Sequence, residues 1–293
     1  MRLINASYEI LDPPVSNNLS GVYKHIELCG RTCYKSEDRI MPGSAPDFVA
    51  RMLQSKHYSV LEHGTIYLTI PKKNVLLSMD RLKYDCILGN SYSKYTEDPD
   101  NYYITTNYRV IVENNLQDLS EYITYFTDKH EPRVTVRFIC SRGIANEFVR
   151  HRHFSFSQES TRYCNYNKDK FDNQLTFIKP YWCNLEPGTY SVYDPVICKL
   201  NEEITEKDYT FFINLSDVQG DYNALISAGC IAQEAREILP LCTKTELIMT
   251  GFLSDWREFF NQRALGTTGA PHPDAKYLAE PLMHDFKQRF NYE

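Results

Sequence analysis

The stretch from Arg150 to Tyr163 constrains this chain more than any other part of it. It holds Arg150, Arg152 and Arg162, two histidines, and hydroxyl and amide side chains between them. No apolar period of helix or strand type continues through it, so it is expected to be a loop that follows a helix. A planar guanidinium suits phosphate and carboxylate groups. The stretch therefore predicts an anion site, most simply for a phosphorylated small molecule, with a basic surface loop as the alternative.

The composition limits the class of protein. The chain has 293 residues, of which 42% are hydrophobic and 24% charged, as in a soluble globular protein. Its net charge of -6 argues against general nucleic-acid binding, which needs a basic surface. No apolar run is long enough to span a membrane, and Met1–Ile10 lacks the pattern of a signal peptide. The nine cysteines show no zinc-ligand spacing, so we expect reduced thiols, a cytoplasmic location and no metal site.

The order of residues in the central stretch is more specific than its composition. Arg150-His151-Arg152, then seven residues, then Ser160-Thr161-Arg162 resemble the Arg-His-Arg-x7-Ser-x-Arg signature of the flavin-dependent thymidylate synthases. Every fixed position of that signature is filled. The resemblance covers most of the chain outside an insertion at about 71–132, so we expect a single domain, 1–293, that carries this insertion.

Two shorter segments also resemble motifs of this family. His57–Gly64 resembles a His-x-(Ser/Thr)-x-x-Glu-His turn, in which Ser59 would face the flavin. Ala235–Pro240 resembles an Ala-Arg-x-x-Leu-Pro motif, whose arginine, here Arg236, would bind the nucleotide. The alternative for Arg236 is that it only complements the dipole of a helix C-terminus.

The chain also departs from the family pattern. Many members carry Gln, a pyrimidine ligand, at the position of Glu147, and a carboxylate accepts hydrogen bonds but cannot donate them. The family commonly carries Asn and Arg as flavin ligands where this chain has Phe252 and Ser254.

The resemblance implies a fold and an activity. The fold would be α/β (α+β), with an antiparallel-rich central sheet and flanking helices. The enzyme would convert dUMP to dTMP, with methylenetetrahydrofolate as one-carbon donor and FAD, reduced by NADPH, as hydride source. Family members are homotetramers whose active sites are shared between subunits, so the expected partners are a nucleotide, a folate and further copies of the chain.

The resemblance also implies roles for single residues. Arg263 would contact the pyrimidine, favour its ionised form and act in catalysis; a salt bridge, for example with Glu258, is the structural alternative. The dUMP site would comprise Glu147, Arg150, Gln158, Glu159, Ser160, Thr161, Arg162, Arg236 and Arg263. The FAD site would comprise Ser59, Arg150, His151, Arg152, Gln158, Ser254 and Glu258.

Other readings of these residues stay open. Ser160 could be a nucleophile with His151 or His153 as its base, although a positioning hydroxyl suits flavin chemistry better. Cys164 could serve as in the cysteine-dependent thymidylate synthases, but its surroundings do not resemble theirs. The whole chain could be a non-catalytic nucleotide-binding homologue, or a transferase that makes another 5-substituted pyrimidine nucleotide.

Hydrophobic periodicity and breaker residues predict the secondary structure. Strands are predicted at Arg2–Ile10, Thr65–Ile70, Tyr103–Val112 and Val134–Cys140. Helices are predicted at Val22–Cys29, Ala45–Leu53, Val75–Ile87, Leu116–Phe126, Gly143–Arg152, Asn223–Leu239, Lys244–Arg263 and Ala275–Phe290, and within Cys198–Leu215. Gly89–Tyr102 is predicted to be a tyrosine-rich loop that either packs on the core or covers the active site.

Overall fold

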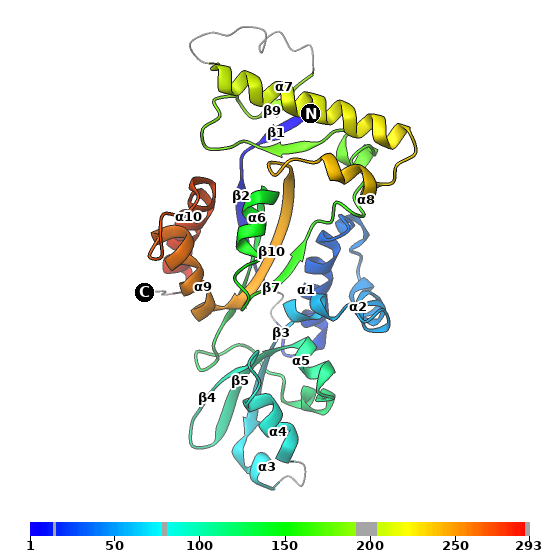
Figure 1. Cartoon of the computed structure of the whole chain (residues 1–293). Helices are drawn as coiled ribbons and strands as arrows, with labels where there is room; N and C mark the ends of the chain where they lie inside the picture. Colours follow the sequence, from blue (N-terminus) through cyan, green and yellow to red (C-terminus); the bar gives the residue numbers. More distant parts are fainter. Residues whose placement is uncertain (14–15, 78–80, 192–203, 291–293) are drawn as a thin grey trace.

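The centre of the molecule is a four-stranded antiparallel sheet. The computed structural model describes residues 1–13, 16–77, 81–191 and 204–290. The sheet has the order β2-β6-β10-β7 (Figure 1), with strands at Ser7–Leu11 (β2), Arg133–Ser141 (β6), Lys244–Phe252 (β10) and Ser155–Gln158 (β7). All three neighbouring pairs are antiparallel, and β6 and β10 pair along their full length. The predicted antiparallel-rich central sheet is confirmed.

Two three-stranded sheets lie beyond its ends. One has the order β3-β5-β4 and is antiparallel, with strands at Thr65–Pro71, Asn101–Asn107 and Lys94–Glu97. The other has the order β8-β1-β9, with strands at Thr176–Ile178, Arg2–Ile4 and Gly188–Thr189. In it, β1 pairs with β8 in parallel and with β9 antiparallel.

Helices flank these sheets. The α-helices are Leu19–Thr32 (α1), Ser44–Gln54 (α2), Lys72–Leu77 (α3), Arg81–Leu88 (α4), Tyr108–Glu113 (α5), Arg142–Phe148 (α6), Glu206–Ser227 (α7), Ala232–Ala235 (α8), Leu253–Phe260 (α9) and Pro273–Phe290 (α10). Short 3-10 turns are Glu37–Arg39 (η1), Tyr58–His63 (η2), Gln117–Tyr122 (η3), Asp169–Phe171 (η4) and Arg236–Ile238 (η5), and a π-helical turn, Asn261–Leu265 (η6), continues α9. In the described part of the chain, no helix combines the length and apolarity that crossing a membrane requires.

The two faces of the four-stranded sheet have different partners. Figure 1 shows α9 and α10 on one side of the sheet and α1 and α2 on the other. On the first side, Phe138 and Met249 of the sheet pack with Phe148 of α6, Trp256 of α9 and Phe286 of α10. Because α6 follows β6 and α9 follows β10, this face brings the ends of two separate chain segments together.

The opposite face of the sheet is more polar. Leu11 and Ile248 pack there against Cys29 of α1. The same face carries Thr135 of β6 and Thr250 of β10, whose hydroxyls lie 2.8 Å apart and are buried. Two further apolar cores surround the small sheets: one joins β3 and β5 to α1, α2, α4 and α5, and one lies between α7 and the sheet that contains β1.

Several predicted elements are confirmed with slightly different ends. They are the helices at Val22–Cys29, Ala45–Leu53 and Ala275–Phe290 and the strands at Thr65–Ile70 and Val134–Cys140. Each has a clear helical or alternating period, because each buries one face and exposes the other. Helix α7 covers the end of the segment Cys198–Leu215, whose first part lies outside the described residues.

The predicted helix Lys244–Arg263 is wrong in its first half. Lys244–Phe252 is β10, a central strand in which every residue after Lys244 is buried. A strand that is buried on both faces has a continuous apolar run rather than an alternating one, so periodicity does not separate it from a helix. The helix itself starts only at Leu253.

The central stretch is not wholly a loop either. Ser155–Gln158 is β7 and pairs with β10, with Phe156 opposite Met249. The alternation of Phe154 and Phe156 with Ser155 and Ser157 fits a strand, but both serines are buried, so the pattern lacks a polar solvent face.

Other predicted bounds also need correction. Arg2–Ile10 is two strands in different sheets, and Asn223–Leu239 is the end of α7, then a turn through Gly229 at φ +99°, then α8. Strand Tyr103–Val112 ends at Asn107, whose side chain caps α5. In place of the predicted helix Val75–Ile87 the structure has α3 and α4, on either side of residues 78–80, which lie outside the described residues. The predicted helix Leu116–Phe126 contains only η3, and the predicted helix Gly143–Arg152 ends at Phe148. The predicted loop Gly89–Tyr102 contains β4.

The insertion at 71–132 has a defined place. Its strands β4 and β5 extend a sheet from β3, and its helices pack in the core shared with α1 and α2. Tyr84 and Tyr108 are buried in that core, whereas Tyr92 and Tyr95 are exposed. The description of the chain as one domain with an insertion stays a prediction.

Candidate active site

The packing of α6 and α9 on one face of the sheet builds a cluster of three polar side chains. Ser141 caps α6, since its Oγ accepts from the main-chain N–H of Ile144 at 3.2 Å. The helix then delivers Glu147 and, just past its end, His151. The π-helical turn after α9 delivers Arg263 to the same place. Residues more than a hundred positions apart in the sequence therefore meet.

Arg263 connects the other two residues. Its Nη1 donates to Glu147 Oε2 at 2.5 Å, its Nη2 donates to the main-chain oxygen of Glu147 at 3.0 Å, and its Nε donates to His151 Nε2 at 3.1 Å. The side chains of Arg263 and Glu147 are 16% and 29% exposed, so the ion pair is partly shielded yet open to a ligand. Such a guanidinium is fixed in orientation by three hydrogen bonds.

His151 is held in its neutral form. Burial, and next the positive charge of Arg263, lower the pKa of His151 to about 4, although Glu258 acts in the opposite direction. A neutral ring has a bare nitrogen, and His151 Nε2 uses it to accept from Arg263. The ring also packs edge-on against Phe259, with the centroids 5.1 Å apart. His151 thus orients Arg263 instead of carrying charge itself.

An open cleft of about 800 Å³ lies against this cluster, and we call it the Arg263 cleft. It is lined by Glu147, Arg150, His151, Gln262, Arg263 and residues 268–273. Four of the residues predicted for the two ligand sites therefore share one cavity. The wall formed by 268–273 was missed, although Gly266 at φ +69° and Gly269 at φ +138° mark a tight loop that the glycine spacing of the sequence indicates.

The phosphate-site residues predicted around Ser160 lie at a second place. Ser160 N donates to the main-chain oxygen of Cys33 at 3.0 Å, which fixes the loop on the end of α1. Arg162 is exposed, and its Nε donates to Gln233 Oε1 of α8 at 3.1 Å. Arg236 is the C-cap of the same short helix, with its side chain 41% exposed. Arg162 and the turn carrying Arg236 are thus neighbours through Gln233, and neither lines the Arg263 cleft.

Glu159 is built into the interior beneath this loop. Its side chain is 1% exposed, Oε2 accepts from Lys244 Nζ at 2.7 Å, and Oε1 accepts from the Tyr166 hydroxyl at 2.9 Å. Lys244 also binds Glu246, which in turn binds Lys35 at 2.9 Å. Burial alone would raise the pKa of Glu246, but the two lysines outweigh it and lower the pKa to about 2. Glu159 is therefore engaged by internal partners in this structure.

The remaining residues predicted for the flavin lie on several elements. Ser59 is exposed on η2, Arg152 is exposed after α6, and Glu258 accepts from Gln262 Nε2 at 2.5 Å. Gln158 Nε2 donates to Thr245 Oγ1 at 3.3 Å. Thr161, which was predicted for the dUMP site, is buried.

Ser254, at the start of α9, has an unexpected neighbour. Its Oγ accepts from Lys94 Nζ of β4, so the insertion reaches this helix end. The same ammonium lies 4.5 Å from the ring centroid of Phe252. A cation from the insertion thus stands beside the two positions that depart from the family pattern.

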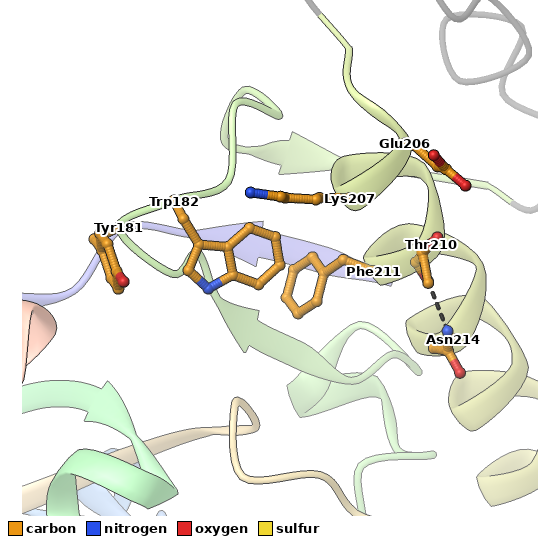
Figure 2. Close-up of a pocket in the computed structure, with 7 residues that line it drawn as sticks. All are labelled: Tyr181, Trp182, Glu206, Lys207, Thr210, Phe211 and Asn214. Carbon is orange, nitrogen blue, oxygen red and sulfur yellow. Dashed lines mark hydrogen bonds between the residues drawn. The ribbon is translucent and has the colours of Figure 1, made fainter.

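A different hollow, of about 740 Å³, lies between the first turns of α7 and the loop after β8. Figure 2 shows Trp182 and Phe211 side by side in it, with Lys207 across from the indole. None of the predicted site residues lines it. It borders the region of the Arg263 cleft, because Tyr181 N donates to Asp274 Oδ1 at 2.9 Å, next to the cleft residue Pro273.

Comparison with known proteins agrees with the motifs. The model of a family described as thymidylate synthase complementing protein (Thy1) matches residues 129–290. A flavin-dependent thymidylate synthase of Mycolicibacterium vanbaalenii is 24% identical over 255 residues, which are 86% of this chain and 72% of that protein. One of Corynebacterium efficiens is 30% identical over 135 residues, which are 42% of this chain and 46% of that protein.

Among solved structures, the UMP/dUMP methylase PolB from Streptomyces cacaoi, bound with 5-Br dUMP, aligns over 98% of this chain and 93% of its own. The sequence identity is 15% and the TM-score 0.44. The residues matched by the family model include β6, α6, β7, β10 and α9, and they include every residue that lines the Arg263 cleft.

Proposed function

This chain belongs to the thymidylate synthase complementing protein family, and from that premise we propose that it is a flavin-dependent thymidylate synthase converting dUMP to dTMP. The observation that carries the proposal is the fixed Arg263 guanidinium at the wall of a cleft, held by Glu147 and His151. Methylenetetrahydrofolate is the proposed one-carbon donor, and NADPH the proposed reductant of FAD.

Arg263 is suited to the electrostatic part of this reaction. A guanidinium has five N–H groups, so three hydrogen bonds to protein leave two for a pyrimidine. Placed beside the ring, Arg263 stabilises negative charge on N3 and O4 and so raises the electron density at C5, the carbon that must react. Glu147 can accept from N3–H while the ring is neutral, and it balances the charge of Arg263.

The other predicted residues would bind the phosphate groups. Arg162 and Arg236 are exposed arginines on neighbouring elements and suit the dianionic phosphate of dUMP, with the Ser160 hydroxyl beside them. Arg150 and Arg152 are exposed donors that suit a pyrophosphate, and Arg150 lines the cleft, so this donor set fits FAD. FAD reduced by NADPH would supply the hydride, and the chain would bind and orient the reactants.

The assembly and the location are proposed on different grounds, the first on the homotetramers that the resemblance implies and the second on the cysteine pattern of reduced thiols. We propose a homotetramer whose subunits share active sites, in the cytoplasm. Light scattering on the purified protein tests the assembly: a mass of four chains of 34.3 kDa supports it, and a monomer at working concentration contradicts it.

Mass spectrometry of the nucleotide product tests the activity. The protein is incubated with dUMP, methylenetetrahydrofolate, NADPH and FAD, and the product should gain one methyl group. Unchanged dUMP, with folate and flavin shown to be competent in a parallel reaction, contradicts the proposal. Arg162→Ala should lose dUMP affinity, whereas Arg137→Ala, on the inner strand β6 and paired with Glu9 of β2, should not.

A transferase that makes another 5-substituted pyrimidine nucleotide is the second candidate. The carboxylate of Glu147 favours it, because this group presents only acceptors to the ring of the ligand. The same mass measurement separates the two, since a different substituent gives a different gain in mass. Recovery of bound nucleotide without any gain in mass, and without a yellow chromophore, would indicate a non-catalytic binding homologue.

A further inference from the structure

A second cavity, of about 800 Å³, lies on the other face of the four-stranded sheet. We call it the α1–β6 cavity. Its walls come from the end of β2, the first half of α1, the start of β3, the segment 125–134 and the end of α10, and they include His25, Tyr67, Tyr125, Phe126 and Arg133. It shares no residue with the Arg263 cleft. Its volume is that of a small-molecule site.

One wall of this cavity holds a buried cation. Arg133 is 7% exposed, and within the described ranges no carboxylate lies at ion-pair distance from it. Its Nη1 donates to the main-chain oxygen of Glu62 at 3.0 Å and to Thr65 Oγ1 at 3.3 Å, and its Nη2 donates to Ser155 Oγ at 3.2 Å. Glu62 itself binds Arg109. Burying a charge without a counter-charge costs several kcal/mol, so this wall favours an anion.

Two donors or acceptors at this wall have no partner. Arg133 Nε and His25 Nδ1 are both buried and make no hydrogen bond within the part of the chain that the structure describes. Arg133 and Thr135 lie on the same face of β6, and His25 Nε2 binds Thr135 Oγ1 at 2.9 Å. The two open groups therefore belong to one polar patch in an otherwise mostly apolar cavity.

The hydrogen bonds at His25 Nε2 can change direction when a ligand binds at Nδ1. A row of hydrogen bonds runs from His25 Nε2 through the hydroxyls of Thr135 and Thr250 to His63 Nδ1, with steps of 2.9, 2.8 and 2.7 Å. Each hydroxyl donates once and accepts once, so the row can run in either direction. When His63 Nδ1–H donates into the row, His25 Nε2 accepts and its Nδ1–H becomes a donor, as an anion requires.

The mouth of the cavity is aromatic. Tyr125 is 52% exposed and Phe126 is 50% exposed, and Phe126 packs edge-on against Tyr67 at 5.2 Å. The rim charges, Asp12 paired with Arg289 and the exposed Asp128, are in contact with water, which screens them. The cavity thus combines exposed aromatic rings at its mouth with a shielded guanidinium that has no ion-pair partner among the described residues, although the charges of Glu62 and Asp255 act on it from a longer distance.

We propose that the α1–β6 cavity binds a small aromatic carboxylate, whose ring packs against Tyr67, Tyr125 and Phe126. Its carboxylate pairs with the guanidinium of Arg133, and it accepts from Arg133 Nε and His25 Nδ1 after the side chains that cover these two buried atoms shift. The proposal does not rest on the synthase reaction, although Arg133 also lies 5.5 Å from the ring centroid of Phe252. A purely structural role for Arg133, as a brace between η2, β3 and β7, is the outcome that contradicts this proposal.

Calorimetric titration with 2-naphthoate and its neutral analogue 2-naphthamide tests it on the full chain. The wild-type protein should bind the carboxylate at least about tenfold more tightly than the amide, because only the carboxylate compensates the buried charge. Arg133→Met keeps a long side chain without the charge and should abolish that preference. Arg137→Met, on the same strand, should leave it unchanged.

Two results would overturn the proposal. One is equal affinity of the wild-type protein for the two probes. The other is naphthoate binding that is unchanged in Phe126→Ala, a variant of a half-exposed residue, since the anion would then sit elsewhere. Both remain decisive if Arg133→Met fails to fold. A third result would also contradict the proposal, namely that the cavity holds an apolar side chain from a second copy of the chain. In that case Phe126→Ala would dissociate a dimer, and naphthoate would have no effect.

Discussion

Arg263 binds both the side chain and the main chain of Glu147, with Nη1 at 2.5 Å from Oε2 and Nη2 at 3.0 Å from the carbonyl oxygen. The second contact ties the guanidinium to the end of α6, so its position does not depend on the rotamer of the Glu147 side chain. The arginine that faces the cleft is therefore fixed before any ligand binds. Pre-organised charge of this kind is the main source of electrostatic stabilisation of a transition state.

Arg263→Lys should lower kcat/KM by about 10²–10³-fold, because lysine keeps the charge but loses the fork that reaches Glu147 and His151 together. Steady-state rates of dTMP formation give the number. Arg257→Lys, on an exposed face of α9, is the matched control and should keep wild-type rates. A rate within twofold of wild type for Arg263→Lys would remove Arg263 from the mechanism.

The structure also predicts a loss of stability in mild acid. Burial, with a contribution from Arg133, lowers the pKa of His25 to about 4, and burial lowers that of His63 to about 3. In the unfolded chain both titrate near 6.5. Below pH 6.5 the unfolded chain therefore binds protons that the folded chain does not, so stability is full above pH 6.5 and falls as the pH drops toward 4.

Urea unfolding at pH 7 and pH 5 measures this effect. Each histidine should account for about 2 kcal/mol of lost unfolding free energy over that interval. His25→Gln should lose less between the two pH values than the wild type does. Glu246 does not interfere, because its lowered pKa acts only between about 4.5 and 2. An equal loss in both proteins would show that His25 titrates normally.

How much of this could be read from the sequence depends on how local each feature is. The sequence predicts ligand-site roles for Arg150, His151 and Arg263, and these three residues line one cleft. The helix predicted to carry Arg263 is, however, a strand in its first half. Pairing of β10 with β6 depends on a register between segments about a hundred residues apart, which local periodicity does not encode. Helices with one polar face, such as α2 and α10, were found because their pattern is local.

No local sequence pattern indicates the buried partners of Glu159 and Arg133. Glu159 lies next to Ser160 in the motif, and the sequence gives no sign that its carboxylate turns inward to Lys244 and Tyr166. Lys94 reaches Ser254 across 160 residues from an insertion that the motifs do not cover. Such contacts are set by tertiary packing alone.

Glu159→Gln should destabilise the fold by roughly 1–3 kcal/mol, because Lys244 loses one of its two buried carboxylate partners. The KM for dUMP should change much less than the stability does. Urea unfolding and dUMP titration on the same sample measure both quantities, and Glu37→Gln, at the outer end of the same network, serves as control. A large rise in KM at unchanged stability would instead make Glu159 a direct ligand.

Lys94→Met should weaken FAD binding roughly fivefold, the equivalent of about 1 kcal/mol for one exposed charge contact. The reason is that Lys94 is the cation beside Ser254, a residue proposed to bind the flavin. Quenching of flavin fluorescence measures the affinity. Lys129→Met, which removes an ion pair with Asp98 within the insertion, should leave FAD affinity unchanged. Equal affinities of Lys94→Met and wild type would exclude a flavin contact through the insertion.

Gly251→Ala should destabilise the fold by about 1–3 kcal/mol through overpacking. A Cβ at this point of β10 would lie 2.6 Å from two ring carbons of Phe154, which is itself packed edge-on against Trp256 at 4.7 Å. The ring can yield only by moving the segment just after Arg-His-Arg, so the cleft should be disturbed as well.

Gly220→Ala is the matched control: nothing lies within 4 Å of its added Cβ in α7, and it should stabilise by about 0.5–1 kcal/mol. Thermal unfolding of both variants gives the comparison, and a gain in stability for Gly251→Ala would mean that Phe154 is not confined.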